Sequence, residues 1–384
     1  MSDYLTTAGC TKILTELIQI NSSQPEGNEK LVVDQILAML PQTTETEIID
    51  HGENRQSLII KIPGESDQGG VAFVGHTDTV TCGDLSQWHH PPFEAVVENG
   101  YLYGRGAADM KGGDASMLAA ALTILQEGRR PKEPIYFCFT ADEEVGGMGA
   151  LALSQHPALA TVREFIIAEP TGEQIGIAEK GALWLRLEVT GQLAHGSRPE
   201  IGVNAVEWAI AFYQRFLALV PQQEEHPYLG KSTVSVTRLQ GGIMTNVIPE
   251  HAQLEMDIRT LPSVDQDQLI AGARRIAEEL EQTVKGLSLR LEVLNDRPPV
   301  ETPEQDPFVQ RLQQVCREAG GESAIRGLHF YTDASQLIPR FRKPFVILGP
   351  GDDKMAHQTN EQVKIQSVVR VAQRYVDYLK KYYF

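Results

Sequence analysis

The stretch Val71-Ala-Phe-Val-Gly-His-Thr-Asp78 joins an apolar run to a histidine and an aspartate. A short apolar run of this kind favours a buried strand. Residues two apart on an extended chain point to the same side, so His76 and Asp78 can act together. One of them can bind a metal ion while the other orients the imidazole ring. The stretch therefore predicts a strand with a metal ligand at its carboxyl end.

Four other segments place acidic or histidine side chains at the ends of predicted strands or in the loops beyond them. They are Gly104–Gly112, Asp142-Glu143-Glu144, Glu169-Pro170-Thr171 and Ala356-His357-Gln358. In open α/β sheets, ligands bind outside the carboxyl ends of the strands. Two histidines and several carboxylates gathered there suit zinc, cobalt or manganese, and one carboxylate can bridge two ions. The set predicts a two-metal site that activates water.

The expected helices and strands divide the chain into two domains. Apolar strands at 57–62, 71–75, 134–140 and 164–168 alternate with helices, which favours an α/β layer with a mainly parallel sheet. Between residues 179 and 295 the order becomes βαββαβ, which is typical of a two-layer ferredoxin-like sandwich. A chain of 384 residues is also too long for one simple core. We expect a discontinuous domain, 1–178 and 296–384, interrupted by an inserted domain, 179–295.

Charge and cysteine content exclude several classes of partner. The net charge of −17 disfavours nucleic acid, whose phosphates need clustered lysine and arginine, and a like-charged membrane surface. No apolar run approaches the ~18 residues of a membrane span, and residues 1–20 do not read as a secretory signal. The four cysteines lie far apart without CxxC spacing. Free thiols in a reducing cytoplasm are therefore expected.

Together these segments resemble the M20 metallopeptidase family, and most closely its branch of succinyl-diaminopimelate desuccinylase and acetylornithine deacetylase. The segments that carry the resemblance are His76-Thr77-Asp78, Gly104–Gly112, Asp142-Glu143-Glu144, Glu169-Pro170-Thr171 and Ala356-His357. The likeness runs along almost the whole chain. It implies a zinc-peptidase-like α/β/α catalytic domain with an inserted lid or dimerisation domain, and a homodimer that pairs through residues 179–295.

The resemblance also implies a role for each candidate residue. Two Zn²⁺ ions, replaceable by Co²⁺ or Mn²⁺, would be bound by His76, Asp109, Glu144, Glu169 and His357. His76 and Glu169 would serve one ion, Glu144 and His357 the other, and Asp109 would bridge both. Glu143 would be the general base, which fits a carboxylate beside a ligand. Asp78 would orient His76.

The inserted domain is expected to complete the site. Ala194-His195-Gly196-Ser197 resembles the family motif whose histidine stabilises the oxyanion in the active site of the partner subunit. Asn246 and Arg259 match positions that bind the substrate backbone and carboxylate, and arginine suits a carboxylate because its fork is bidentate. In the first domain, Thr332 belongs to a segment that resembles a loop near the substrate.

The favoured substrate is N-succinyl-L,L-diaminopimelate, cleaved to succinate and L,L-diaminopimelate for lysine and cell-wall synthesis. N-acetylornithine, or a dipeptide or carboxypeptidase substrate, remains an alternative, because the ending Ala356-His357-Gln358-Thr359-Asn360-Glu361 leans towards deacetylases and peptidases. A metal-binding regulatory protein without catalysis is a remote alternative. Loss of the base or of a ligand would mark such a protein, and this chain keeps them all.

Overall fold

The computed structural model describes residues 2–321 and 323–384, which form two compact units. The first unit consists of Met1–Ile177, Glu301–Arg326 and Thr332–Phe384, and the second of Ala178–Val300 and Gly327–Tyr331. The sequence places residues 178, 296–300 and 327–331 in the first domain, whereas the structure places them in the second unit. The reason is local: the carbonyl of Leu328 accepts a hydrogen bond from the Lys180 N–H at 3.0 Å, and the Arg297 guanidinium lies 5.8 Å from the centre of the Tyr331 ring.

A mixed sheet forms the centre of the first unit. Within the described residues its strand order is β1-β2-β6-β3-β7-β17-β8-β15, with β16 beside β8. The bounds are β1 Glu45–Gly52, β2 Arg55–Ile62, β3 Val71–His76, β6 Ile135–Thr140, β7 Glu164–Ile167, β8 Ile175–Glu179, β15 Val300–Glu301, β16 Ile325–Leu328 and β17 Phe345–Ile347. The neighbours β6, β3, β7 and β17 run parallel, whereas β1, β2 and β8 add antiparallel pairs. The expected mainly parallel sheet is thus correct only for its centre, because the β1–β2 hairpin extends it antiparallel.

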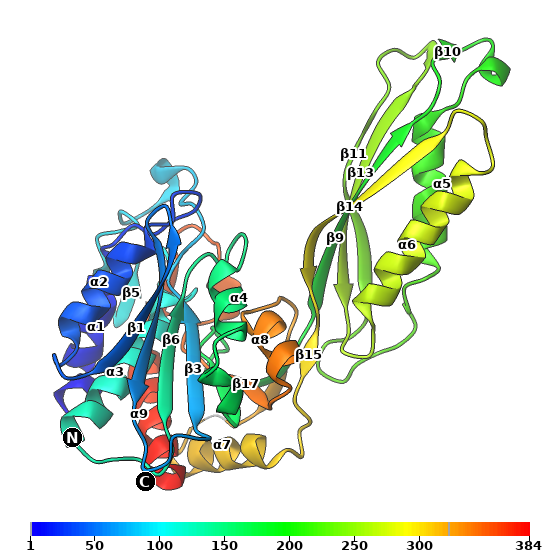
Figure 1. Cartoon of the computed structure of the whole chain (residues 1–384). Helices are drawn as coiled ribbons and strands as arrows, with labels where there is room; N and C mark the ends of the chain where they lie inside the picture. Colours follow the sequence, from blue (N-terminus) through cyan, green and yellow to red (C-terminus); the bar gives the residue numbers. More distant parts are fainter. Residues whose placement is uncertain (1, 322) are drawn as a thin grey trace. The chain divides into compact units, whose positions relative to one another are not determined.

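Helices cover both faces of this sheet. The helices α1 Thr7–Ile18, α3 Lys111–Glu127 and α9 Ile365–Tyr382 pack together on one face, and α4 Met148–Ser154 packs with α8 Ala334–Phe341 on the other (Figure 1). Every residue of β3 and of β6 is buried, as expected for strands covered on both sides. Phe73 of β3 stacks on Phe137 at 4.8 Å and meets Tyr375 of α9 at 5.0 Å. The result is an α/β/α layering.

Two further helices and a small sheet also belong to the first unit. Helix α2, Glu29–Met39, contacts β2, and helix α7, Pro307–Glu318, contacts α9 and β17. The strands β4 Val96–Glu98, β5 Tyr101–Tyr103 and β18 Gln362–Lys364 form a small separate sheet. This sheet joins the long segment before α3 to the segment before α9.

The second unit is a ferredoxin-like sandwich. Its sheet has the antiparallel order β11-β13-β9-β14, with bounds β9 Gly181–Thr190, β11 Thr233–Gly241, β13 His251–Thr260 and β14 Ser288–Arg297. Helices α5 Ala205–Leu217 and α6 Gln266–Glu281 cover one face. Strand β13 alternates between buried and half-buried residues, so one face meets the helices. A two-strand ladder joins β10 Ala194–His195 to β12 Val247–Ile248. The layering of the first unit and this strand order confirm the predicted fold class.

Two features bear on the expected environment of the protein. The four cysteines are free thiols, as the sequence predicts. Among residues 2–321 and 323–384, no helix combines the length and the apolar character needed to cross a bilayer.

Candidate metal centre

The candidate ligands converge at one edge of the first unit's sheet. His76 is the last residue of β3, Glu144 follows β6, Glu169 follows β7, and His357 lies beyond β17. These strands are parallel neighbours, so their carboxyl ends lie at the same edge. Asp109 arrives from the loop that leads into α3.

The carboxylate of Asp109 lies between two histidines. Its Oδ1 is 3.1 Å from His76 Nε2, and its Oδ2 is 3.3 Å from His357 Nε2. Glu169 Oε1 lies 3.6 Å from His76 Nε2, and Glu144 Oε2 lies 2.9 Å from His357 Nε2. The five residues therefore form two groups of one histidine and one glutamate that share Asp109.

This donor set suits metal ions. One ligand atom each from His76, Asp109 and Glu144 lie within 4.8 Å of one another. Imidazole nitrogens and carboxylate oxygens are the ligands of zinc and of related divalent ions. An Asp109 carboxylate with one oxygen towards each group has the arrangement that a ligand bridging two ions requires.

The electrostatics of the cluster also favour a cation. Burial by itself would lower the pKa of His76, but its hydrogen bonds with Asp109 and Asp78 hold that pKa well above the usual value. Hydrogen bonds with Asp109 and Glu144 raise the pKa of His357 to about 10. Burial, and then the charge of Asp109, raise the pKa of Glu169. The metal-free cluster therefore retains protons at positions where divalent ions would neutralise the excess negative charge.

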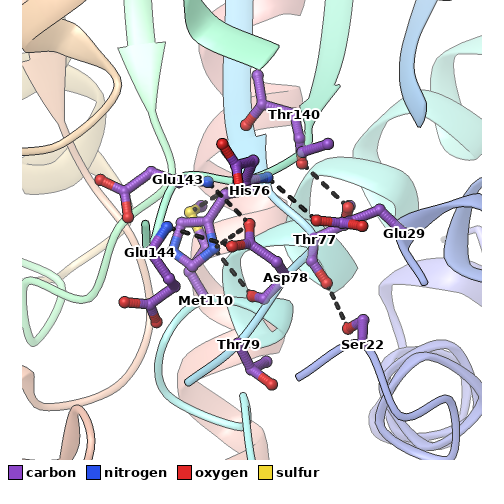
Figure 2. A network of polar contacts seen from close by, with 12 residues as sticks. Ser22, Glu29, His76, Thr77, Asp78, Thr79, Met110, Thr140, Glu143 and Glu144 are labelled. Carbon is purple, nitrogen blue, oxygen red and sulfur yellow. Dashed lines mark hydrogen bonds and ion pairs between the residues drawn. The ribbon is translucent and has the colours of Figure 1, made fainter. Parts of the chain in front are cut away.

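Glu143 differs from its neighbour Glu144. Its side chain is buried, with the residue only 8% exposed, and burial raises the pKa of its carboxyl group well above the usual value. Its backbone N–H donates to Asp78 Oδ1 at 3.1 Å (Figure 2). Among the described residues no hydrogen bond or ion pair engages the Glu143 carboxylate, whereas that of Glu144 faces His357. Glu143 is thus free to exchange a proton.

Asp78 contacts more than the histidine that the sequence assigns to it. The closest acceptor for His76 Nδ1 is the backbone carbonyl of Asp78 at 3.0 Å, and the carboxylate Oδ1 is 3.6 Å away. The two carboxylate oxygens accept the backbone N–H groups of Glu143 and Glu144, each at 3.1 Å. Gln24 Nε2 donates to Oδ2 at 2.7 Å. Asp78 therefore positions the loop after β6 as well as the ring of His76 (Figure 2).

The structure brings together seven of the predicted site residues. They are His76, Asp78, Asp109, Glu143, Glu144, Glu169 and His357. Thr332 is 1% exposed, and its hydroxyl accepts a hydrogen bond from the Ala334 N–H at the start of α8. The assignment of Thr332 to substrate binding stays a prediction.

The other three predicted residues belong to the second unit. His195 is exposed, and its Nδ1 lies 3.1 Å from the backbone N–H of Ser197 and 2.8 Å from the Ser197 hydroxyl. Asn246 is exposed, and its carbonyl accepts the Gly196 N–H at 2.7 Å. Arg259 forms a two-pronged pair with Asp257, at 2.8 and 3.0 Å. Their roles towards substrate also stay predictions.

Glu361 is a site residue that sequence reasoning missed. It is fully buried, and its carboxylate accepts the backbone N–H groups of Gly106, Ala108 and Asp109 at 2.8–2.9 Å and Arg105 Nη1 at 2.7 Å. It therefore fixes the loop that presents the shared carboxylate. The glycine-rich loop was itself a signal, because the backbone N–H groups of a buried loop need an acceptor.

Comparisons with known proteins identify the family. The sequence profile of Peptidase family M20/M25/M40 matches residues 72–381, so the chain belongs to this family, as the resemblance predicts. A Staphylococcus aureus (strain N315) protein named "Probable succinyl-diaminopimelate desuccinylase" is 27% identical to this chain, and the match covers 96% of this chain and 95% of that protein.

Solved structures share the fold. Aminopeptidase PepT from Bacillus cereus has a TM-score of 0.78 at 21% identity, with 98% of each chain covered. A dinuclear metal-binding M20 peptidase from Bacillus subtilis has a TM-score of 0.72 at 17% identity, with 97% of each covered. The protein is therefore an M20-family metallohydrolase.

Proposed function

We propose that the protein is a dizinc amidohydrolase that removes the acyl group from an N-acyl amino acid. The observation that carries the proposal is Asp109, whose two oxygens face two histidine–glutamate pairs at 3.1 and 3.3 Å. The favoured substrate is N-succinyl-L,L-diaminopimelate, in line with the name of the 27% identical relative. Its products would be succinate and L,L-diaminopimelate, for lysine and cell-wall synthesis in the cytoplasm.

The protein residues divide the chemistry among them. When bound, the metal pair would acidify water and polarise the amide carbonyl. Glu143 accepts a proton from the attacking water and returns it to the leaving amine. Its raised pKa, caused by burial, suits a group that must both accept and release a proton. Asp78 keeps the backbone of Glu143 in place through the hydrogen bond at 3.1 Å.

The geometry of His195 suits oxyanion stabilisation. The backbone N–H of Ser197 can only donate, so His195 Nδ1 must be the acceptor in their contact of 3.1 Å. A neutral ring then carries its proton on Nε2, which is a donor for a developing oxyanion. Following the family resemblance, we assign His195 to the active site of the partner subunit.

Homodimerisation through residues 179–295 is part of the proposal. Strand β11 is one of the two edge strands of the second unit's sheet, and it exposes Val236 by 38% and Leu239 by 49%. Unpaired edge strands of this kind are prone to pair with another chain. Sedimentation velocity tests the assignment, and a monomer at working concentration would contradict it.

Substrate contacts are assigned to Asn246, Arg259 and Thr332. The Arg259 fork is occupied by Asp257 in this structure. A substrate carboxylate would take the place of Asp257, since both offer the same two oxygens to the fork. Arg259→Lys, which keeps the charge but loses the fork, should therefore raise KM more than it lowers kcat.

The deciding experiment is hydrolysis of N-succinyl-L,L-diaminopimelate beside N-acetyl-L-ornithine and a set of dipeptides. Each substrate is assayed before chelation, after chelation, and after return of Zn²⁺, Co²⁺ or Mn²⁺. The proposal expects metal-restored turnover with the highest kcat/KM for the succinyl substrate. Preference for another amide would support the amidohydrolase assignment but change the proposed substrate. Metal binding without turnover of any substrate would favour the regulatory alternative.

A further inference from the structure

We infer that Arg55, at the start of β2, is a positioning residue that holds the loop of Glu143 and Glu144 in its working conformation. The part of this inference that concerns catalysis rests on the proposed function. Arg55 touches neither the candidate ligands nor Glu143. It acts on them through Asp142 and through a relay of Gln24 and Asp78.

The guanidinium of Arg55 is surrounded by acceptors. Its Nη1 donates to Asp142 Oδ1 at 2.8 Å and to Glu29 Oε1 at 3.1 Å. Its Nη2 donates to Gln24 Oε1 at 2.7 Å and to the Pro25 carbonyl at 2.6 Å. The side chain is only 12% exposed, so these contacts are shielded from water. The planar fork of arginine serves several fixed acceptors at once, which lysine cannot do.

The direct route to the loop runs through Asp142. This residue has φ 68°, in the left-handed region that is uncommon for residues other than glycine, although aspartate adopts it more often than most. Its backbone N–H donates to Glu29 Oε1 at 3.1 Å, and its carboxylate binds Arg55. Arg55 and Glu29 thus fix the residue immediately before the base.

The relay of Gln24 and Asp78 explains how Arg55 influences the position of Glu143. Because Gln24 Oε1 faces Arg55, its amide nitrogen must face Asp78, and Nε2 lies 2.7 Å from Asp78 Oδ2. Without Arg55 the amide loses the contact that determines its orientation. Asp78 in turn holds the N–H groups of Glu143 and Glu144 at 3.1 Å. Figure 2 shows the last part of this chain, from Asp78 to the loop.

A plain structural role for Arg55, neutralising the buried carboxylates Glu29 and Asp142, predicts a different outcome. Loss of such a pair lowers the stability of the whole region. Loss of a positioning contact instead lowers kcat, leaves KM nearly unchanged, and loosens the loop 141–147 selectively. Gln24→Glu tests the last step of the relay, because it keeps a partner for Arg55 and replaces the donor to Asp78 by a second carboxylate.

The experiment compares R55M, R55K and Q24E with the control K61M. Lys61 lies on the same strand, and its Nζ is 3.8 Å from Glu45 Oε2. We expect R55M and Q24E to lower kcat ~10-fold or more, with KM within ~2-fold, since small misplacements of catalytic groups cost up to ~10²-fold. R55K should be intermediate, and K61M should match the wild type. If R55M does not fold, R55K and Q24E carry the test.

Hydrogen exchange of the metal-free protein gives a readout that does not depend on activity. The inference expects faster exchange in residues 141–147 of R55M and Q24E, with α1 and α9 unchanged. Unchanged kcat and unchanged exchange in this loop would overturn it. So would faster exchange throughout the unit, which would indicate a structural role alone. A wild-type protein that hydrolyses no amide would refute the proposed function, while the exchange would still decide whether Arg55 positions the loop 141–147.

Discussion

Replacing Glu361 by glutamine should destabilise the first unit although the side chain keeps its size. One carboxylate oxygen accepts the N–H groups of Ala108 and Asp109, and the other accepts Gly106 N–H and Arg105 Nη1. A glutamine amide can replace only one of these oxygens, because its NH₂ group is a donor. In either orientation two buried donors lose their acceptor.

The size of the effect follows from that count. Each buried donor left without an acceptor costs ~1–3 kcal/mol, so Glu361→Gln should lower the free energy of unfolding by ~2–6 kcal/mol. The upper part of the range applies if Arg105 is one of the two, because an uncompensated buried charge costs ~3–5 kcal/mol. The same loop carries Asp109, so metal affinity should fall as well.

Urea unfolding at pH 8 in the presence of a chelator measures the change. Trp88 lies 5.1 Å from the Arg105 guanidinium, so its fluorescence reports this region once Trp184 and Trp208 are replaced by phenylalanine. Glu98→Gln is the matched control, because that side chain is 55% exposed and lies 3.3 Å from His90. A difference below ~1 kcal/mol between E361Q and the wild type would refute the reasoning, since it is less than one unpaired buried donor costs.

Further expectations concern the metal centre. Glu143→Ala should keep its metal content, measured by atomic spectroscopy, and lose at least ~10²-fold in kcat; turnover like that of the wild type would remove Glu143 as the base. His195→Ala should impair turnover without loss of metal, and a fall in metal content would contradict its assigned role. In the metal-free protein the pKa of His357 rises from 6.5 to about 10, so the stabilisation by its protonated ring is complete below pH 6.5 and is lost as the pH rises through about 10. Thermal melts across that range should show the loss, and His357→Ala should abolish it. Zn²⁺ binding at pH 7.5 should release that proton. Calorimetry in two buffers of different ionisation enthalpy should detect it, and a release unchanged in His357→Ala would contradict this assignment.

Most of the architecture could be predicted where the local pattern was strong. The expected strands at 71–75 and 134–140 correspond to β3 and β6 with ends that differ by one residue. The order βαββαβ predicted the second unit, and its central strands β9 and β13 alternate between buried and more exposed residues. Strand β1 was missed because most of its residues are exposed, so no apolar run marks it. Strands β4 and β5, of three residues each, are too short to show a period.

The sequence by itself determined which residue types stand at the ends of the strands, and therefore the metal-binding chemistry and the family. The placement of each ligand after a strand follows from local patterns, since an apolar run marks the strand and the ligand follows it, whereas the order of the strands in the sheet came only from the tertiary structure. Only the tertiary structure decided which partners hold those residues in place. Glu361 meets Gly106 across 255 residues, and Arg55 meets Asp142 across 87. A lone glutamate or arginine carries no local signal of such a partner, because the contact exists only after the chain has folded.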